Sequence, residues 1–318
     1  MTDMRFRRLG GSGLAVSVVG VGCNNFGRRM DDSKVDEAVH TALEVGINLF
    51  DTADSYGDPH GRSEELLGAA LGTRRDEAIV ATKFGSDIGG SNGPDWNARG
   101  SRRYIHRAAE ASLRRLGTDH IDLYQMHVPD PATPIEETLD ALDDLVRAGK
   151  VRYIGHSNFT AWQLADAAWT AQSRHRTRFV SAQNEYSLLD RSVEAELVPA
   201  CLRFGVGLLP YFPLASGLLT GKYRRDQVPP AGSRLARPNF TARLANAPWD
   251  VIEKLEAYAD KRGLTLLDVA IGGLAAQPAV ASVIAGATSA DQVRANAAAV
   301  RWQPSPADLD ELNEITRS

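Results

Sequence analysis

Four polar side chains of different chemistry stand at spaced positions in the first half of the chain: Asp51, Tyr56, Lys83 and His127. A phenol is a poor proton donor at neutral pH, because its ordinary pKa is about 10, unless a nearby cation stabilises the phenolate. Lys83 can supply that cation, Asp51 can keep Lys83 charged and oriented, and a neutral His127 can hydrogen-bond the same substrate oxygen. Together the four side chains would make a proton donor for a reacting oxygen.

Each of these residues ends or follows a short apolar run that is typical of a buried strand. The runs cover residues 46–50, 78–81 and 121–125, and helix-like segments separate them. If the strands are parallel, the four side chains emerge at one end of the sheet, which is where α/β barrels keep their chemistry. Taken singly, an Asp after a strand is often a helix cap, a Lys is usually solvated and a Tyr usually packs in a core. Chance does not readily explain four such residues in order at successive strand ends.

Strand-like and helix-like patterns alternate through the whole chain. The expected strands cover residues 18–22, 47–50, 78–83, 121–126, 151–155, 179–183, 206–210 and 281–285. The expected helices cover residues 33–44, 63–71, 101–116, 134–147, 160–171, 194–203, 248–261, 265–276 and 289–299. Eight βα pairs predict an α/β fold, a single closed (β/α)8 TIM barrel. No linker or break in composition divides the chain, so we expect one domain over residues 1–318.

Further segments flank this alternation. A Gly-rich turn at residues 10–13 predicts a β-hairpin over residues 7–18. Two long loops, at about 84–100 and 212–246, follow strands and should overhang the C-terminal mouth of the barrel, and loops of this length are uncommon in compact domains unless they are functional or mobile. A tail from about residue 301 carries a helix-like run and could also reach the mouth.

Composition excludes several classes of protein. Of the 318 residues 43% are hydrophobic and 24% are charged, which predicts a sizeable core with little disorder. The net charge of −4, without a basic block, argues against general nucleic-acid binding. Two cysteines, Cys23 and Cys201, are too few for a disulfide framework, and no histidine pair has zinc-ligand spacing, so we expect no metal. Without an apolar leader or a run of about 20 apolar residues, we expect a cytoplasmic protein with no membrane partner.

The ordered motifs of the chain resemble those of the aldo-keto reductase superfamily almost from end to end. The matching stretches are residues 9–17, 51–57, 61–64, 112–124, 155–159, 183–187 and 217–223. This resemblance implies that the hairpin closes the bottom of the barrel. It also implies that Tyr56 protonates the oxygen of a small-molecule carbonyl substrate while a nicotinamide delivers hydride, with Asp51, Lys83 and His127 completing a tetrad.

A nicotinamide cofactor would have to be held by the barrel itself, because the chain lacks the Gly-x-Gly-x-x-Gly fingerprint of a doubly wound fold. The resemblance implies that Ser157, Asn158 and Gln183 bind the nicotinamide carboxamide and that Tyr211 stacks on its ring. It assigns the remaining cofactor contacts to Gly22, Asp51, Phe212, Pro213, Leu214, Ser216, Gly217, Lys222, Arg234, Gly286, Thr288, Gln292 and Asn296.

NADPH is favoured over NADH in this interpretation. A 2′-phosphate needs a cation or a fork of donors, yet Thr288 stands where relatives often carry Arg or Lys. Arg234 and Arg294 could compensate for that difference.

The expected substrate wall consists of Phe26, Tyr56, Trp96 and His127, which suggests an apolar carbonyl compound. His156 departs from the small or apolar residue that is usual before Ser157. We expect it to be a packed, hydrogen-bonded histidine at the end of a strand rather than a second imidazole that tunes the cofactor.

Other functions stay open at this point. The first is an NAD-dependent sugar or alcohol dehydrogenase that runs mainly as an oxidant. The second is a regulatory binding module that resembles the potassium-channel β-subunits, since the pattern around Lys222, Tyr223 and Arg234 is close to that branch. His127 stands where those subunits carry a different residue, which favours turnover. A scaffold that has lost activity is a weaker alternative, because the tetrad is intact. The sequence leaves the particular substrate, the direction of reaction and the oligomeric state open.

Overall fold

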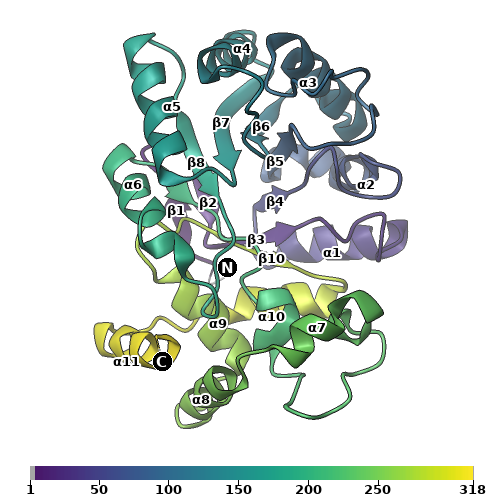
Figure 1. Ribbon diagram of the computed structural model, residues 1–318. Helices are drawn as coiled ribbons and strands as arrows, with labels where there is room; N and C mark the ends of the chain where they lie inside the picture. The colour runs from purple at the N-terminus through teal and green to yellow at the C-terminus, as the bar shows by residue number, and fades with distance from the viewer. Residues whose placement is uncertain (1–3, 318) are drawn as a thin grey trace.

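The computed structural model describes residues 4–317 (Figure 1). Residues 1–3 and 318, which the expected domain includes, lie outside the described residues. Eight parallel strands form one sheet in the order β10-β3-β4-β5-β6-β7-β8-β9. Their bounds are β3 (Val19–Gly22), β4 (Leu49–Asp51), β5 (Ile79–Phe84), β6 (Ile121–Met126), β7 (Val151–Ser157), β8 (Phe179–Gln183), β9 (Gly207–Leu208) and β10 (Val283–Gly286).

The sheet closes on itself between its first and last strands. The backbone N–H of Leu208 in β9 donates to the Ala279 carbonyl at 2.7 Å, and the Leu208 carbonyl accepts from Ala281 at 2.9 Å. Further along, the Ile284 N–H of β10 donates to the Pro210 carbonyl at 2.9 Å. These bonds leave no open edge, so the expected (β/α)8 barrel is confirmed.

Helices surround the barrel and follow its strands (Figure 1). Their bounds are α1 (Asp32–Glu44), α2 (Arg62–Leu71), α3 (Arg102–Leu116), α4 (Ile135–Arg147), α5 (Ala161–Ser173), α6 (Leu197–Phe204), α7 (Thr241–Ala245), α8 (Trp249–Asp260), α9 (Leu266–Ala275), α10 (Ala290–Ala299) and α11 (Pro306–Thr316). Local signals define their ends: Thr160 caps α5 in a capping box with Gln163, and Gly117 ends α3 in the left-handed conformation. Short 3-10 helices are η1 (Gly72–Glu77), η2 (Ser192–Glu194), η3 (Ala215–Thr220), η4 (Arg234–Ala236) and η5 (Pro238–Phe240).

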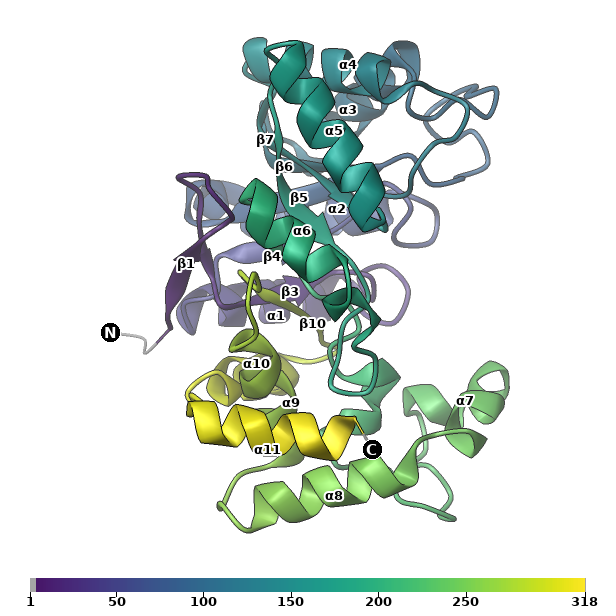
Figure 2. The same ribbon diagram turned by 60° about the vertical axis from the view of Figure 1, so that its left-hand side comes forward.

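The hairpin of β1 (Phe6–Arg8) and β2 (Ala15–Ser17) lies at the end of the barrel opposite the long loops, on the left of Figure 2. Its turn binds the short segment between α6 and β9, since the Gly11 N–H donates to the Gly205 carbonyl at 2.7 Å. Gly10 has a φ of 57°, and a Cβ there would run into the Gly205 carbonyl. Leu9 and Val16 are fully buried among residues of the barrel interior. The hairpin therefore plugs the barrel bottom, as the resemblance implied.

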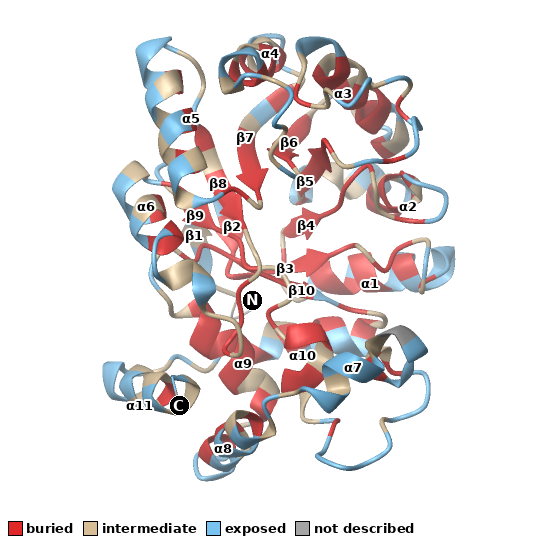
Figure 3. Cartoon of the chain, viewed as in Figure 1, coloured by how far each residue is buried: buried red, intermediate tan, exposed pale blue. Residues whose placement is uncertain are grey.

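Buried residues concentrate on the strands and on the sides of the helices that face them (Figure 3). The largest apolar cluster lies between the strands and helices α1 to α6, α9 and α10, and a small one fills the barrel floor. A third cluster joins α8, α9 and α11 to the segment after β9, with Leu219, Leu255 and Val269 fully buried. That segment, expected to be a long loop over 212–246, contains η3, η4, η5 and α7 and is held by this cluster.

Candidate active site

The tetrad residues meet at the carboxyl ends of β4, β5 and β6. Lys83 Nζ lies 2.7 Å from Asp51 Oδ2, 2.9 Å from the Thr52 carbonyl and 3.4 Å from the Tyr56 hydroxyl. The Lys83 side chain is fully buried and that of Asp51 is 3% exposed. A buried ammonium is costly unless it is paired and hydrogen-bonded, so Asp51 and the Thr52 carbonyl together fix its position.

The loop after β4 presents Tyr56 to this ammonium. The Tyr56 N–H donates to the Ala53 carbonyl at 3.1 Å, and the Tyr56 carbonyl accepts from Gly61 at 3.0 Å. Gly57 has a φ of 95°, and a Cβ there would lie 2.7 Å from Cβ of Arg62. A glycine is therefore needed for the loop to sit tightly on the first turn of α2.

Burial of the Tyr56 hydroxyl raises its pKa above the ordinary value, and the charge of Lys83 opposes this shift. Lys83 lowers the pKa of Tyr56 as expected, but burial outweighs this effect, so the net shift is upward. Burial likewise favours a neutral Lys83, but Asp51 and Tyr56 together outweigh it and raise the pKa of that ammonium. The pair therefore consists of a neutral phenol and a charged lysine at neutral pH.

His127 approaches Tyr56 from β6. The two rings meet edge to face, with centroids 5.8 Å apart and an interplanar angle of 80°. Burial, helped by the charge of Lys83, lowers the pKa of His127 to about 3, so its imidazole is neutral as expected. Nδ1 of His127 lies 3.5 Å from the Ser55 hydroxyl. When Ser55 donates to Nδ1, the ring proton is on Nε2, where it can be donated to a ligand.

A cavity of about 800 Å³ opens above the tetrad at the mouth of the barrel. Asp51, Tyr56 and His127 form part of its wall, whereas the fully buried Lys83 lies behind Tyr56. The structure brings every expected cofactor residue to this cavity: Gly22, Asp51, Ser157, Asn158, Gln183, Tyr211, Phe212, Pro213, Leu214, Ser216, Gly217, Lys222, Arg234, Gly286, Thr288, Gln292 and Asn296.

Near the tetrad, the cavity is lined by the side-chain amides of Asn158 and Gln183 and by the ring of Tyr211. The Tyr211 hydroxyl donates to Asn158 Oδ1 at 2.9 Å, and Asn158 Nδ2 donates to the His127 carbonyl at 2.9 Å. Gln183 Nε2 donates to Asp51 Oδ1 at 2.8 Å, which leaves the amide oxygen of Gln183 for a ligand. A flat ring held beside fixed amides suits a nicotinamide with its carboxamide.

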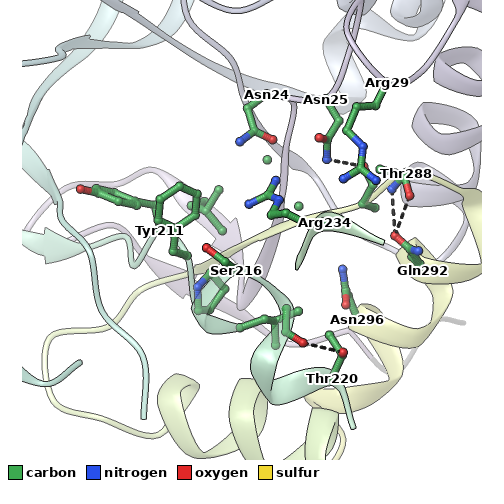
Figure 4. Close-up of a pocket in the computed structure, with 18 of the residues that line it drawn as sticks. Asn24, Asn25, Arg29, Tyr211, Ser216, Thr220, Arg234, Thr288, Gln292 and Asn296 are labelled. Atoms are coloured by element: carbon green, nitrogen blue, oxygen red, sulfur yellow. Dashed lines mark hydrogen bonds between the residues drawn. The ribbon is translucent and has the colours of Figure 1, made fainter. Parts of the chain in front are cut away.

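The far end of the cavity is cationic (Figure 4). Arg29 and Arg234 both line this end, with Arg29 Nη2 3.3 Å from the Gly232 carbonyl and the Arg234 guanidinium 5.8 Å from the Phe212 ring centroid. Burial lowers the pKa of Arg234, and repulsion by Arg29 and Arg237 adds to the shift. An anionic ligand would relieve this repulsion.

Backbone conformation adds to the anion site. Ala215, Ser216 and Gly217 of η3 have φ values of 46°, 62° and 104°. Left-handed residues turn successive N–H groups toward one side and form concave sites for phosphate oxygens, and strained non-glycine residues of this kind concentrate at functional sites. The residues present therefore fit a dinucleotide with its phosphates beside η3.

Among the lining residues that sequence reasoning missed are Asn24, Asn25 and Arg29, which follow β3 (Figure 4). Asn25 Nδ2 donates to the Ala287 carbonyl at 3.0 Å and joins the ends of β3 and β10. The place of Asn24 and Asn25 directly after a predicted strand was a usable signal. Nothing in the sequence distinguishes Arg29 from Arg28, which lines a separate surface hollow.

Two expected substrate-wall residues lie elsewhere, which corrects the sequence-based assignment. Phe26 is fully buried in the layer between strands and helices, because the chain after β3 turns it inward. Trp96 is 65% exposed on the loop after β5, where its ring packs against the Arg103 guanidinium at 4.6 Å. Neither side chain lines the cavity.

Two other side chains also differ from expectation. Arg294 binds Asp291 at 3.2 Å and the Thr41 hydroxyl at 3.4 Å on the α1 side, and it does not line the cavity. His156 is packed as expected, with ring centroids 4.5 Å from Phe159 and 5.3 Å from Phe179. The expected hydrogen bonds are wrong, because neither ring nitrogen of His156 has a partner among the described residues.

Within residues 4–317 no cluster of three or more His, Cys, Asp or Glu side chains could hold a metal ion. In the same part of the chain, no helix has the length and apolarity needed to cross a membrane.

The barrel holds a paired lysine and carboxylate beside a phenol, and a cavity that fits a dinucleotide lies above them. This combination is typical of a carbonyl oxidoreductase. A model of the Aldo/keto reductase family matches residues 18–317, and the chain belongs to this family. It is an NAD(P)H-dependent oxidoreductase, as the resemblance implied.

Relatives whose names indicate different roles match nearly the full length of the chain. A probable voltage-gated potassium channel subunit beta of Arabidopsis thaliana is 37% identical over 99% of this chain and 97% of the relative. An uncharacterized oxidoreductase of Bacillus subtilis is 38% identical over 98% and 96%. The versiconal hemiacetal acetate reductase of Aspergillus parasiticus is 34% identical over 98% and 96%.

Proposed function

We propose that this protein reduces aldehydes or ketones to alcohols with NADPH and that Tyr56 donates the proton. The observation that carries the proposal is the contact of Lys83 Nζ with both Asp51 Oδ2 and the Tyr56 hydroxyl, at 2.7 and 3.4 Å, directly under the cavity. Proton donation by a positioned side chain typically accelerates a reaction about 10²- to 10⁴-fold.

In this mechanism the carbonyl oxygen lies between the Tyr56 hydroxyl and the His127 ring. Tyr56 gives its proton to that oxygen, and the phenolate that forms is stabilised by the nearby ammonium of Lys83. Neutral His127 donates from Nε2 to the same oxygen and orients it. When bound beside Tyr211, a reduced nicotinamide supplies the hydride that the carbonyl carbon accepts. Asn158 and the amide oxygen of Gln183 would hold the carboxamide so that one face of the ring meets the substrate.

The preference for NADPH rests on charge at the far end of the cavity. Arg234 and Arg29, with Arg237 close by, supply the cations that a 2′-phosphate requires, although Thr288 lacks one. We expect the protein to act in the cytoplasm on a small, largely apolar carbonyl compound.

The test follows cofactor absorbance with NADPH and with NADH over a panel of aromatic aldehydes, dicarbonyls and simple ketones. Consumption of NADPH supports the proposal, and faster turnover of alcohols with NAD would favour the dehydrogenase alternative.

A second candidate is a redox-sensing binding module. Relatives from Arabidopsis thaliana and Oryza sativa, 37% and 36% identical, are both named probable potassium channel β-subunits. Tight NADPH binding without turnover of any carbonyl, together with co-purification of a membrane protein, would favour this function. The presence of His127 beside Tyr56 favours catalysis.

A further inference from the structure

The Asp51 carboxylate is held from two sides. Its Oδ2 accepts from Lys83, while its Oδ1 accepts from two amides, Gln183 Nε2 at 2.8 Å and Gln125 Nε2 at 3.3 Å. Gln183 lines the cavity, so a ligand can reach it. Gln125 is fully buried inside the barrel and does not line the cavity. The two amides that share Oδ1 therefore differ in their exposure to ligand.

Gln125 is fixed by a second contact on its other side. The Ser181 hydroxyl of β8 donates to Gln125 Oε1 at 3.2 Å, so both ends of the amide are bonded. The hydrogen bonds run from Ser181 through Gln125 to Asp51 and Lys83, all of which are buried. Because a buried amide without partners is costly, this pairing defines one orientation of the Gln125 side chain.

The barrel interior is shaped around this amide. Strand register aligns Lys83 with Gln125, Gln125 with Gly155, and Gly155 with Ser181. A Cβ at Gly155 would run into the Ser181 hydroxyl and lie 3.2 Å from Gln125 Cγ. Barrel interiors are usually filled by branched apolar side chains, so a glutamine beside a glycine at this level is unexpected for packing alone.

We propose that Gln125 is a positioning residue for proton transfer, and that it acts by holding Asp51 Oδ1 so that Oδ2 stays on Lys83 Nζ. The proposal rests on the proposed function of Tyr56 and goes beyond it. A bound carboxamide can compete with Asp51 for Gln183, which lines the cavity. Gln125 does not line the cavity, so no ligand can reach its hydrogen bond to Asp51. Without it, the carboxylate can turn, Lys83 is held less firmly, and the phenolate of Tyr56 loses stabilisation.

The groups that face Tyr56 determine what a pH measurement reports. They come from five elements or the loops after them, and they are Lys83, Asp51, Cys23, His127 and Tyr211. Burial raises the pKa of the Cys23 thiol, and burial with Lys83 lowers that of His127 to about 3. His127 is therefore neutral at the pH where Tyr56 ionises, whereas a Cys23 thiolate would itself raise the pKa of Tyr56. Because Cys23 is the same in every variant compared, a difference between variants reports chiefly on Lys83 and Asp51.

The experiment compares wild type with Gln125→Met, which keeps the volume of the side chain and removes the amide. Ser181→Ala loosens Gln125 without touching Asp51, and Ser282→Ala is the control, a fully buried serine away from the tetrad. Three quantities are measured on each folded protein: kcat with NADPH, the Kd of NADPH, and the pH at which Tyr56 ionises. The last comes from ultraviolet difference spectra against the same protein carrying Tyr56→Phe.

We expect kcat of Gln125→Met to fall roughly 10- to 100-fold, the effect of losing one hydrogen bond to a charged group. The Kd of NADPH should stay within about twofold, since Gln125 does not line the cavity. Tyr56 should ionise at a higher pH, Ser181→Ala should show a smaller shift in the same direction, and Ser282→Ala should show none. A folded Gln125→Met with wild-type kcat and wild-type Tyr56 ionisation would overturn the inference. If the wild type reduces no carbonyl, the proposed function fails, while the Tyr56 ionisation still decides the role of Gln125.

Discussion

At the scale of single residues, function depends on where charge is placed around one phenol. Lys83 is fully buried, yet its pKa is raised because Asp51 and Tyr56 together outweigh the cost of burial. His127 stays neutral beside it because burial and that same ammonium oppose its protonation. Tyr56 thus has a cation on one side and a neutral hydrogen-bond donor on the other, as a proton donor to a carbonyl requires.

A substitution at Arg29 tests the preference for NADPH over NADH. Replacing Arg29 by Leu removes a cation from the far end of the cavity, where it faces Arg234. We expect the Kd of NADPH to rise about tenfold or more and that of NADH to change little, because only NADPH carries the 2′-phosphate. Fluorescence titration with both cofactors measures this. Equal loss of affinity for the two would show that Arg29 does not discriminate between them.

The tetrad could be predicted from the sequence because each member stands where an apolar run meets a polar loop, and barrel topology gathers such positions. Arg29 could not, since it stands six residues beyond the Cys23 that follows β3 and only the turn of that loop directs it to the cavity. Phe26 shows the reverse error: an aromatic after a strand was expected at the mouth, and the same turn buries it.

At the scale of elements, the loop after β5 is tied to the loop that carries Tyr56. Asn92 is 5% exposed, its Nδ2 donates to Asp54 Oδ2 at 2.9 Å, and its Oδ1 accepts from Arg115 at 3.0 Å. Arg115 continues to Glu64 of α2 at 2.6 Å. The expected long loop over 84–100 is therefore anchored on the elements beside the site.

Asn92→Ala should loosen this anchor. The change removes the Asn92 amide from the buried Asp54 carboxylate, while Arg115 keeps Glu64, and losing that partner costs about 1–3 kcal/mol of the free energy of unfolding. We expect faster proteolytic cleavage within residues 84–100 than in wild type or in Ser86→Ala of the same loop. Unchanged stability and cleavage would mean that the loop is held by other contacts.

Element types were predictable where periodicity and caps agree, as for α3 and α5, whose observed bounds lie within about two residues of those expected. Helix α6 begins three residues later than expected, because η2 takes up the chain ahead of it. The short helices in 212–246 had no signal, since their stability comes from the third apolar cluster and not from local propensity.

At the scale of the whole molecule, two buried imidazoles connect stability to pH. Burial lowers the pKa of His156 to about 3 from an ordinary 6.5, and His127 is lowered similarly. The unfolded chain therefore takes up these protons near pH 6.5, and the folded chain only near pH 3. The stability that neutral imidazoles contribute is complete above pH 6.5 and is lost as the pH falls toward 3, by about 1.4 kcal/mol per pH unit for each histidine.

His156→Phe tests this dependence away from the tetrad, since the His156 ring contacts the rings of Phe159 and Phe179 on the outer side of β7. A phenyl ring fits between these aromatic neighbours and removes two unpartnered nitrogens. We expect the free energy of unfolding to fall less steeply in acid, by about 1.4 kcal/mol per pH unit, in denaturant titrations between about pH 6 and pH 4. His40→Phe, which changes an exposed histidine of α1, is the control. The same acid dependence in His156→Phe and wild type would refute this account.

The central claim concerns the proton from Tyr56, and one comparison tests it most directly. Tyr56→Phe and Tyr124→Phe are assayed side by side for NADPH-dependent carbonyl reduction and for the Kd of NADPH, Tyr124 being a buried tyrosine whose hydroxyl has no hydrogen-bond partner among the described residues. We expect Tyr56→Phe to lose roughly 10²- to 10⁴-fold in kcat and still bind NADPH, while Tyr124→Phe keeps most of its activity. A Tyr56→Phe protein that reduces the same carbonyl at close to the wild-type rate would contradict this claim.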